Sequence, residues 1–168
     1  MGYRLFFPLN TKAQQLFYLR LLHIFMYSFV EMKATLVQCG LKWEDRDSSL
    51  AHISSLLDAA SPGSGIVVLP EMFTTGFTMN PGPLAEKMDG CTVKWMRERS
   101  AAGGYALCGS VIISEAGSYY NRLIFVNPEG EISFFDKRHL HTMSGEHNVY
   151  SRGNKRVVVP YREFIFNL

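Results

Sequence analysis

The hydrophobic pattern from residue 32 onward alternates short apolar runs with longer amphipathic segments. Between residues 44 and 60 the apolar positions recur at helical spacing, at Leu50, Ile53, Leu56 and Leu57. A stop and turn follow in the Ser/Pro/Gly-rich residues 61–65. We expect one helix over 44–60 and a second over about 93–102.

Short apolar runs bounded by turn residues predict the strands. They cover 33–39, 66–69, 105–114, 119–127, 131–136, 156–159 and 163–168. Residues 115–118 and 127–130 have the composition of tight turns. The resulting order, β-α-β-α-β-β-β-β-β, mixes crossovers with hairpins and therefore predicts an α/β fold with a mixed sheet.

Composition and charge exclude several classes of protein. The chain has 168 residues, 47% of them hydrophobic and 19% charged, which is too apolar for a disordered protein. Its net charge of +2 gives no electrostatic footprint for nucleic acid. The three cysteines, Cys39, Cys91 and Cys108, are odd in number and have no CxxC spacing. They predict neither a disulfide framework nor a zinc site, and they fit a reducing, cytoplasmic setting.

The N-terminal residues 1–31 form an apolar extension before the domain at 32–168. Within it, residues 16–30 are largely apolar but contain Arg20 and His23, and they are shorter than the roughly 20 residues of a spanning helix. Three readings stay open: an extension upstream of a natural start at Met32, a membrane-associating anchor, or a native helix packed on the domain. A membrane partner is not expected.

Two charges of opposite sign end apolar runs that are far apart in the sequence. Glu71 follows the run 66–70, and Lys137 follows the run 132–136. A charge at the tip of a buried strand is costly unless it is paired or used, and active sites of α/β sheets gather at strand carboxyl ends. We therefore expect one polar cluster. Glu71 is either a general base or a salt-bridged strand end, and Lys137 either a cation for an oxyanion or a solvated turn residue.

The long polar loop 139–154 supplies further candidates. Glu146 is either an additional carboxylate of the site or a plain surface residue. His139, His141 and His147 together with Glu146 allow a metal site, but their spacing matches no motif with a fixed mechanism. From the residues we therefore expect no metal.

Several segments in the same order together resemble the nitrilase (carbon–nitrogen hydrolase) superfamily and, within it, the omega-amidase branch. They are VVLPEMFTTGF at 67–77, GS at 109–110, YNRL at 120–123, NPEG at 127–130 and FDKRHL at 135–140. The likeness covers residues 32–168. It implies the N-terminal part of an αββα sandwich and a Glu-Lys-Cys triad without a cofactor. By this resemblance Glu71 is the general base, Lys137 the oxyanion stabiliser and Glu146 an orienting glutamate.

The resemblance also implies a substrate, a small ω-amide of a dicarboxylic or keto acid. It further implies that full-length relatives form homo-oligomers. The chain departs from the family at the nucleophile. The family's cysteine follows a strand that residues 163–168 resemble, and no cysteine comes after it here. Cys39, Cys91 and Cys108 lie elsewhere, so we expect a truncated domain that is catalytically inactive. Two alternatives stay open: a non-catalytic fragment or partner-binding half-domain, and a membrane-associated acyltransferase of the same superfamily.

Overall fold

The computed structural model describes residues 31–60, 63 and 65–168. The three readings of residues 16–30 concern a segment that lies outside the described residues. Residues Met32–Leu168 form one compact unit.

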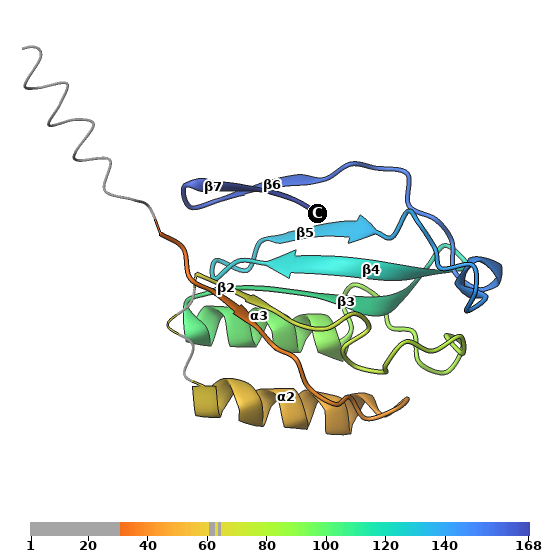
Figure 1. Ribbon diagram of the computed structural model, residues 1–168, viewed down its shortest axis with the longest axis horizontal. Helices are drawn as coiled ribbons and strands as arrows, with labels where there is room; N and C mark the ends of the chain where they lie inside the picture. The colour runs from red at the N-terminus through yellow and green to blue at the C-terminus, as the bar shows by residue number, and fades with distance from the viewer. Residues whose placement is uncertain (1–30, 61–62, 64) are drawn as a thin grey trace, which may run out of the picture. The chain divides into compact units, whose positions relative to one another are not determined.

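A mixed five-stranded sheet forms the centre of this unit (Figure 1). Its strands lie in sequence order: β1 (Ala34–Leu36), β2 (Ile66–Val68), β3 (Ala106–Glu115), β4 (Ser118–Val126) and β5 (Ile132–Asp136). The pairs β1–β2 and β2–β3 are parallel, whereas β3–β4 and β4–β5 are antiparallel. The prediction of an α/β fold with a mixed sheet is confirmed.

The first strand is shorter than the predicted 33–39. Its neighbour β2 pairs over only three residues, because the chain then reaches Pro70, which has no N–H to donate. One further bond, from the N–H of Val37 to the carbonyl of Val68, continues the pairing at 2.9 Å. Beyond Val37, β1 no longer pairs with β2.

Two helices cover one face of the sheet, α2 (Arg46–Ala60) and α3 (Cys91–Gly103) (Figure 1). The first begins two residues later than predicted because Asp45 caps it, accepting the N–H of Ser48 at 3.0 Å. Ile53 and Leu57 are buried as the helical spacing predicted, whereas Leu56 is exposed.

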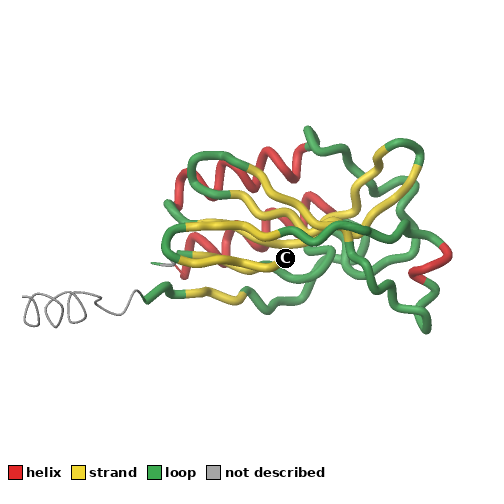
Figure 2. The backbone as a smooth tube through the Cα atoms, turned by 90° about the horizontal axis from the view of Figure 1, so that it is seen from above, coloured by secondary structure: helices red, strands yellow, loops and turns green. Residues whose placement is uncertain are grey.

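The opposite face is covered by a hairpin of β6 (Val158–Tyr161) and β7 (Phe164–Asn167), which forms a second sheet (Figures 1 and 2). The hairpin turns at Arg162–Glu163, later than predicted, with Arg162 in the left-handed region at φ 54°. Phe125 of β4 meets the ring of Tyr161 at 5.6 Å between centroids. The order of layers, helices, sheet and second sheet, is that of the predicted partial sandwich.

The strand directions bring two distant chain segments to one edge. Since β3–β4 and β4–β5 are both antiparallel, β5 runs in the same direction as β3 and β2. The carboxyl ends of β2 and β5 therefore lie at the same edge of the sheet. Glu71 follows the first of these ends and Lys137 follows the second.

Candidate active site

Glu71 stands at the start of a tight turn held against β3. The next residue, Met72, is fully buried and has a φ of 46°, the left-handed region that L residues rarely adopt. Its N–H donates to Oγ of Ser110 at 2.8 Å, and the N–H of Phe73 donates to the Ser110 carbonyl at 3.1 Å. Gly76, at φ 75°, closes the turn by donating its N–H to the Met72 carbonyl. The backbone directly after Glu71 is thereby fixed.

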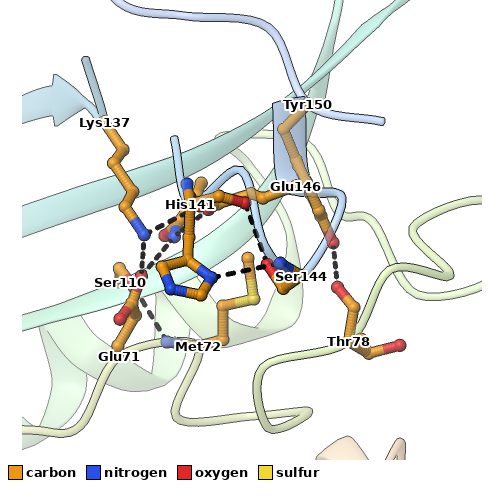
Figure 3. A network of polar contacts seen from close by, with 10 residues as sticks. Glu71, Met72, Thr78, Ser110, Lys137, His141, Ser144, Glu146 and Tyr150 are labelled. Atoms are coloured by element: carbon orange, nitrogen blue, oxygen red, sulfur yellow. Dashed lines mark hydrogen bonds and ion pairs between the residues drawn. The ribbon is translucent and has the colours of Figure 1, made fainter. Parts of the chain in front are cut away.

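Lys137 reaches Glu71 from the end of β5 (Figure 3). Its main-chain N–H donates to the Asn121 carbonyl at 3.0 Å, which ties it to β4. Its ammonium donates to Oε1 of Glu71 at 2.8 Å and to Oε2 of Glu146 at 2.9 Å. Nζ also lies 4.9 Å from the centre of the Phe77 ring, within the range of a cation–π contact. The structure thus brings all three predicted residues together.

Asn121 joins the same cluster, although it was not among the predicted site residues. Its amide Nδ2 donates to Oε1 of Glu71 at 2.7 Å and to Oε1 of Glu146 at 3.1 Å. The residue is only 2% exposed on β4. The sequence signal was present: Asn121 and Arg122 are polar positions inside an otherwise apolar strand. Only the pairing of β4 with β5 shows which of the two faces the cluster.

Glu146 is completely buried, in contrast to the surface position that sequence analysis left open. It begins the short 3₁₀ helix η1 (Glu146–Asn148), and its Oε2 accepts the main-chain N–H of His141 at 2.6 Å. Tyr150 donates its N–H to the Glu146 carbonyl at 2.9 Å and its hydroxyl to the Thr78 carbonyl at 2.7 Å. The loop is therefore anchored on the Met72–Asn80 side, with Glu146 turned inward (Figure 3).

The charges of the cluster stabilise one another. Burial alone lowers the pKa of Lys137, but its hydrogen bonds to Glu71 and Glu146 outweigh burial and raise the pKa. Burial alone raises the pKa of Glu146, but the His141 N–H, Lys137 and Asn121 outweigh it and lower the pKa. Lys137 is thus held as a cation and Glu146 as an anion. The Glu71 side chain is 50% exposed and is therefore the most solvent-accessible of the three charged side chains.

A pocket of about 240 Å³ opens beside these charges. Apolar side chains form most of its wall, and Glu71, Lys137, Asn121 and Ser110 supply the polar groups. The apolar lining residues are Leu69, Pro70, Leu123, Phe135 and Leu168. A carboxylate and an ammonium at the rim of a small apolar pocket can bind a neutral polar group, move a proton and stabilise a developing oxyanion.

None of the three cysteines, all in the described part of the chain, lines this pocket. Cys108 is buried on the hairpin side of the sheet, and burial raises the pKa of its thiol to about 11. Burial also raises the pKa of Cys91 and of Cys39. An activated thiol needs a lowered pKa, so none of the three has the environment of a nucleophile.

Within residues 31–60, 63 and 65–168, no three or more His, Cys, Asp or Glu side chains form a group that could hold a metal ion. His139, His141 and His147 therefore do not assemble with Glu146 into a metal site. In the same residues no helix has the length and apolar character required to cross a bilayer.

Comparisons with known proteins place the chain in a family. Residues 33–163 match the carbon–nitrogen hydrolase family. The omega-amidase YafV of Escherichia coli K12 is 37% identical over 131 residues, covering 78% of this chain and 50% of the relative. The omega-amidase YafV of Yersinia enterocolitica is 39% identical over 135 residues, with the same coverage. The chain thus spans about half the length of the curated relatives it matches.

A solved structure agrees with this likeness. The CN-hydrolase superfamily protein XC1258 of Xanthomonas campestris, which carries an arsenic adduct in its active site, superposes with a TM-score of 0.78 at 35% identity. The superposition covers 81% of this chain and 51% of that protein. Together with the sequence match over residues 33–163, this shows that the chain belongs to the carbon–nitrogen hydrolase family, in its omega-amidase branch.

Proposed function

We propose that residues 32–168 supply the acid–base part of an omega-amidase active site. The substrates are small ω-amides of dicarboxylic or keto acids, and the products are the free acid and ammonia. The observation that carries the proposal is the 2.8 Å contact between Oε1 of Glu71 and Nζ of Lys137 at the rim of the pocket. The names of the relatives, omega-amidase and 2-oxoglutaramate amidase, support the substrate class.

Each residue has a role that follows from its position. Glu71, the exposed carboxylate, takes the proton of a thiol, and the thiolate then attacks the amide carbonyl carbon. Lys137, held as a cation, stabilises the oxyanion of the tetrahedral intermediate. The intermediate collapses as its C–N bond breaks, and ammonia leaves with the proton that Glu71 returns. Water then cleaves the thioester with Glu71 as base and regenerates the thiol. Glu146 and Asn121 hold Glu71 and Lys137 in place.

The thiol is the part of this mechanism that the 168 residues do not place at Glu71. Because Cys39, Cys91 and Cys108 do not line the pocket and have raised pKa values, we infer that the chain alone does not turn over amides. In this proposal the nucleophilic thiol belongs to residues other than these 168, in the same or in another polypeptide. The free cysteines favour a reducing compartment, the cytoplasm, for this chemistry.

Association with another polypeptide is the second candidate function. Leu36, Val158 and Ile165 are 75%, 54% and 77% exposed on the edge strand β1 and on the hairpin. Large exposed apolar side chains mark association surfaces when they gather in one patch. Sedimentation velocity of the chain at several concentrations tests association with a second copy of the chain, and a chain that stays monomeric throughout would contradict this form of the candidate.

The proposed activity is tested by supplying the missing part. Residues 32–168 are joined to the portion of E. coli YafV that the alignment leaves uncovered, and ammonia release from 2-oxoglutaramate is measured. The chimera should release ammonia, and E71Q should lower kcat/KM by about 100-fold or more. The matched control is E129Q, which removes an exposed carboxylate in the turn after β4. A folded chimera without activity, or equal losses in E71Q and E129Q, would refute the proposal. Ammonia release by the chain alone would refute the inference about the thiol.

A further inference from the structure

Ser110 lies behind the candidate base, on the neighbouring strand β3 (Figure 3). It is only 6% exposed and forms part of the pocket wall next to Glu71. Its Oγ accepts the N–H of Met72 at 2.8 Å, and its carbonyl accepts the N–H of Phe73 at 3.1 Å. Both donors belong to the turn that begins directly after Glu71. One residue of β3 therefore binds two successive amides of this turn.

The first of these amides belongs to a residue in an unfavourable conformation. Met72 has a φ of 46° although it is not glycine, and such a conformation persists only where the surroundings enforce it. Its side chain is fully buried and its N–H points at Ser110. Without an acceptor at that place, the Met72 N–H would be a buried donor lacking a partner, which is costly.

Glu71 lies directly before Met72, so the backbone that Ser110 binds also carries the Glu71 side chain. Glu71 contacts Lys137 and Asn121 through the same atom, Oε1, at 2.8 and 2.7 Å. A displacement of Oε1 away from both donors by about 1 Å takes both contacts beyond hydrogen-bond range.

We propose that the Ser110 hydroxyl is a positioning group of the site, which holds Met72 in its left-handed conformation and thereby aims Glu71 at Lys137. The proposal rests on the proposed function only in naming Glu71 as the base, and its geometry is tested without turnover. Threonine keeps the hydroxyl at this position, whereas alanine and valine remove it. The 240 Å³ pocket beside Ser110 leaves room for the added methyl group of threonine or valine.

The test compares four variants of the full chain: S110A, S110T, S110V and S114A. Ser114 lies on the same face of β3 four residues further on and serves as the matched control. Two quantities are measured by NMR on the folded protein: the amide exchange rate of Met72 and the pKa of the Lys137 ammonium. We expect exchange at Met72 to accelerate about tenfold in S110A and S110V. The pKa of Lys137 should fall in both, because its partner Glu71 is displaced.

S110T and S114A should match the wild type in both quantities. A merely structural serine would lower the urea midpoint of unfolding and leave the pKa of Lys137 unchanged, which would overturn the proposal. Equal behaviour of S110T and S110V, which differ only in the hydroxyl, would overturn it as well and remains measurable if S110A fails to fold. An inactive chimera in the amidase assay, combined with the expected NMR result, would refute the proposed function and leave the role of Ser110 standing.

Discussion

Replacing Arg122 by methionine should remove a large part of the stability of the domain. Arg122 is 1% exposed on β4 and donates Nε and Nη2 to the two carboxylate oxygens of Asp136 on β5, at 2.6 and 3.0 Å. The two residues are directly paired in the register of the strands. Their chain neighbours, Asn121 and Lys137, point into the site, so the ion pair fixes the register from the opposite face of the sheet.

The magnitude follows from what the substitution leaves behind. Methionine keeps a flexible apolar side chain over the Phe134 ring, which lies 4.1 Å from the guanidinium carbon. The carboxylate of Asp136 is 17% exposed and loses its counter-charge, and breaking a buried pair in this way costs about 3–5 kcal/mol. Arg122 Nη2 also donates to a second carboxylate, that of Glu115, at 2.9 Å, but the Glu115 side chain is 55% exposed and returns to water with little loss. With a urea m-value of about 2 kcal/mol/M, the midpoint should fall by about 2 M.

Urea unfolding followed by circular dichroism measures this loss. The matched control is R99M, which removes the surface pair with Asp58, where the carboxylate is 65% exposed, and should cost about 0–1 kcal/mol. The double variant R122M/D136L removes both charges and should recover most of the loss. A loss below about 1 kcal/mol in R122M, or a double variant no more stable than the single one, would show that the pair does not secure the strand register.

Three further outcomes are expected. G109A should destabilise the fold by about 1–3 kcal/mol in urea unfolding, because the added Cβ would lie 2.8 Å from Cβ of Leu69. The control G82A should change stability little, since its Cβ would meet only the Tyr119 hydroxyl, at 3.9 Å. Equal effects of the two substitutions would contradict this packing. Because the pKa of Glu146 is lowered in the folded protein, its ionised carboxylate stabilises the fold at pH values above the usual carboxyl pKa of 4.5. This stabilisation is lost as the pH falls through the lower pKa of the folded state, so E146Q should flatten the acid side of the stability–pH curve. A curve parallel to that of the wild type would speak against it. Iodoacetamide should label the exposed Cys91 in the folded chain and Cys108 only on unfolding, since Cys108 is buried with a thiol pKa of about 11; rapid labelling of Cys108 would be inconsistent with its burial.

The sequence predicted the elements and the tips of the two strands for local reasons. Apolar runs interrupted by Gly, Pro and Asn mark β2 to β5, and helical spacing marks α2. A charge at the end of such a run is visible without a structure, so the sequence alone predicts Glu71 and Lys137 as site residues. The general rule that active sites of α/β sheets gather at the carboxyl ends of strands predicted that the two charges form one cluster.

The rest depends on contacts that no local pattern carries. The register of β4 against β5 puts Asn121 into the site and Arg122 on the opposite face, and this register is a property of two strands. The burial of Glu146 arises in a loop without periodicity, where the His141 N–H and the Tyr150 anchor fix its direction. The left-handed Met72 is likewise imposed by Ser110, a residue 38 positions away.

The contact between Glu71 and Lys137 can be tested by zero-length crosslinking of the native chain with a carbodiimide, followed by peptide mass spectrometry. The reagent joins a carboxylate to an amine only where the two are in contact, and the Glu71 side chain is 50% exposed and therefore accessible to it. We expect an amide-linked peptide pair containing Glu71 and Lys137 that disappears in E71Q and in K137R. Recovery of both residues on separate peptides, without the linked pair in the folded wild type, would contradict it.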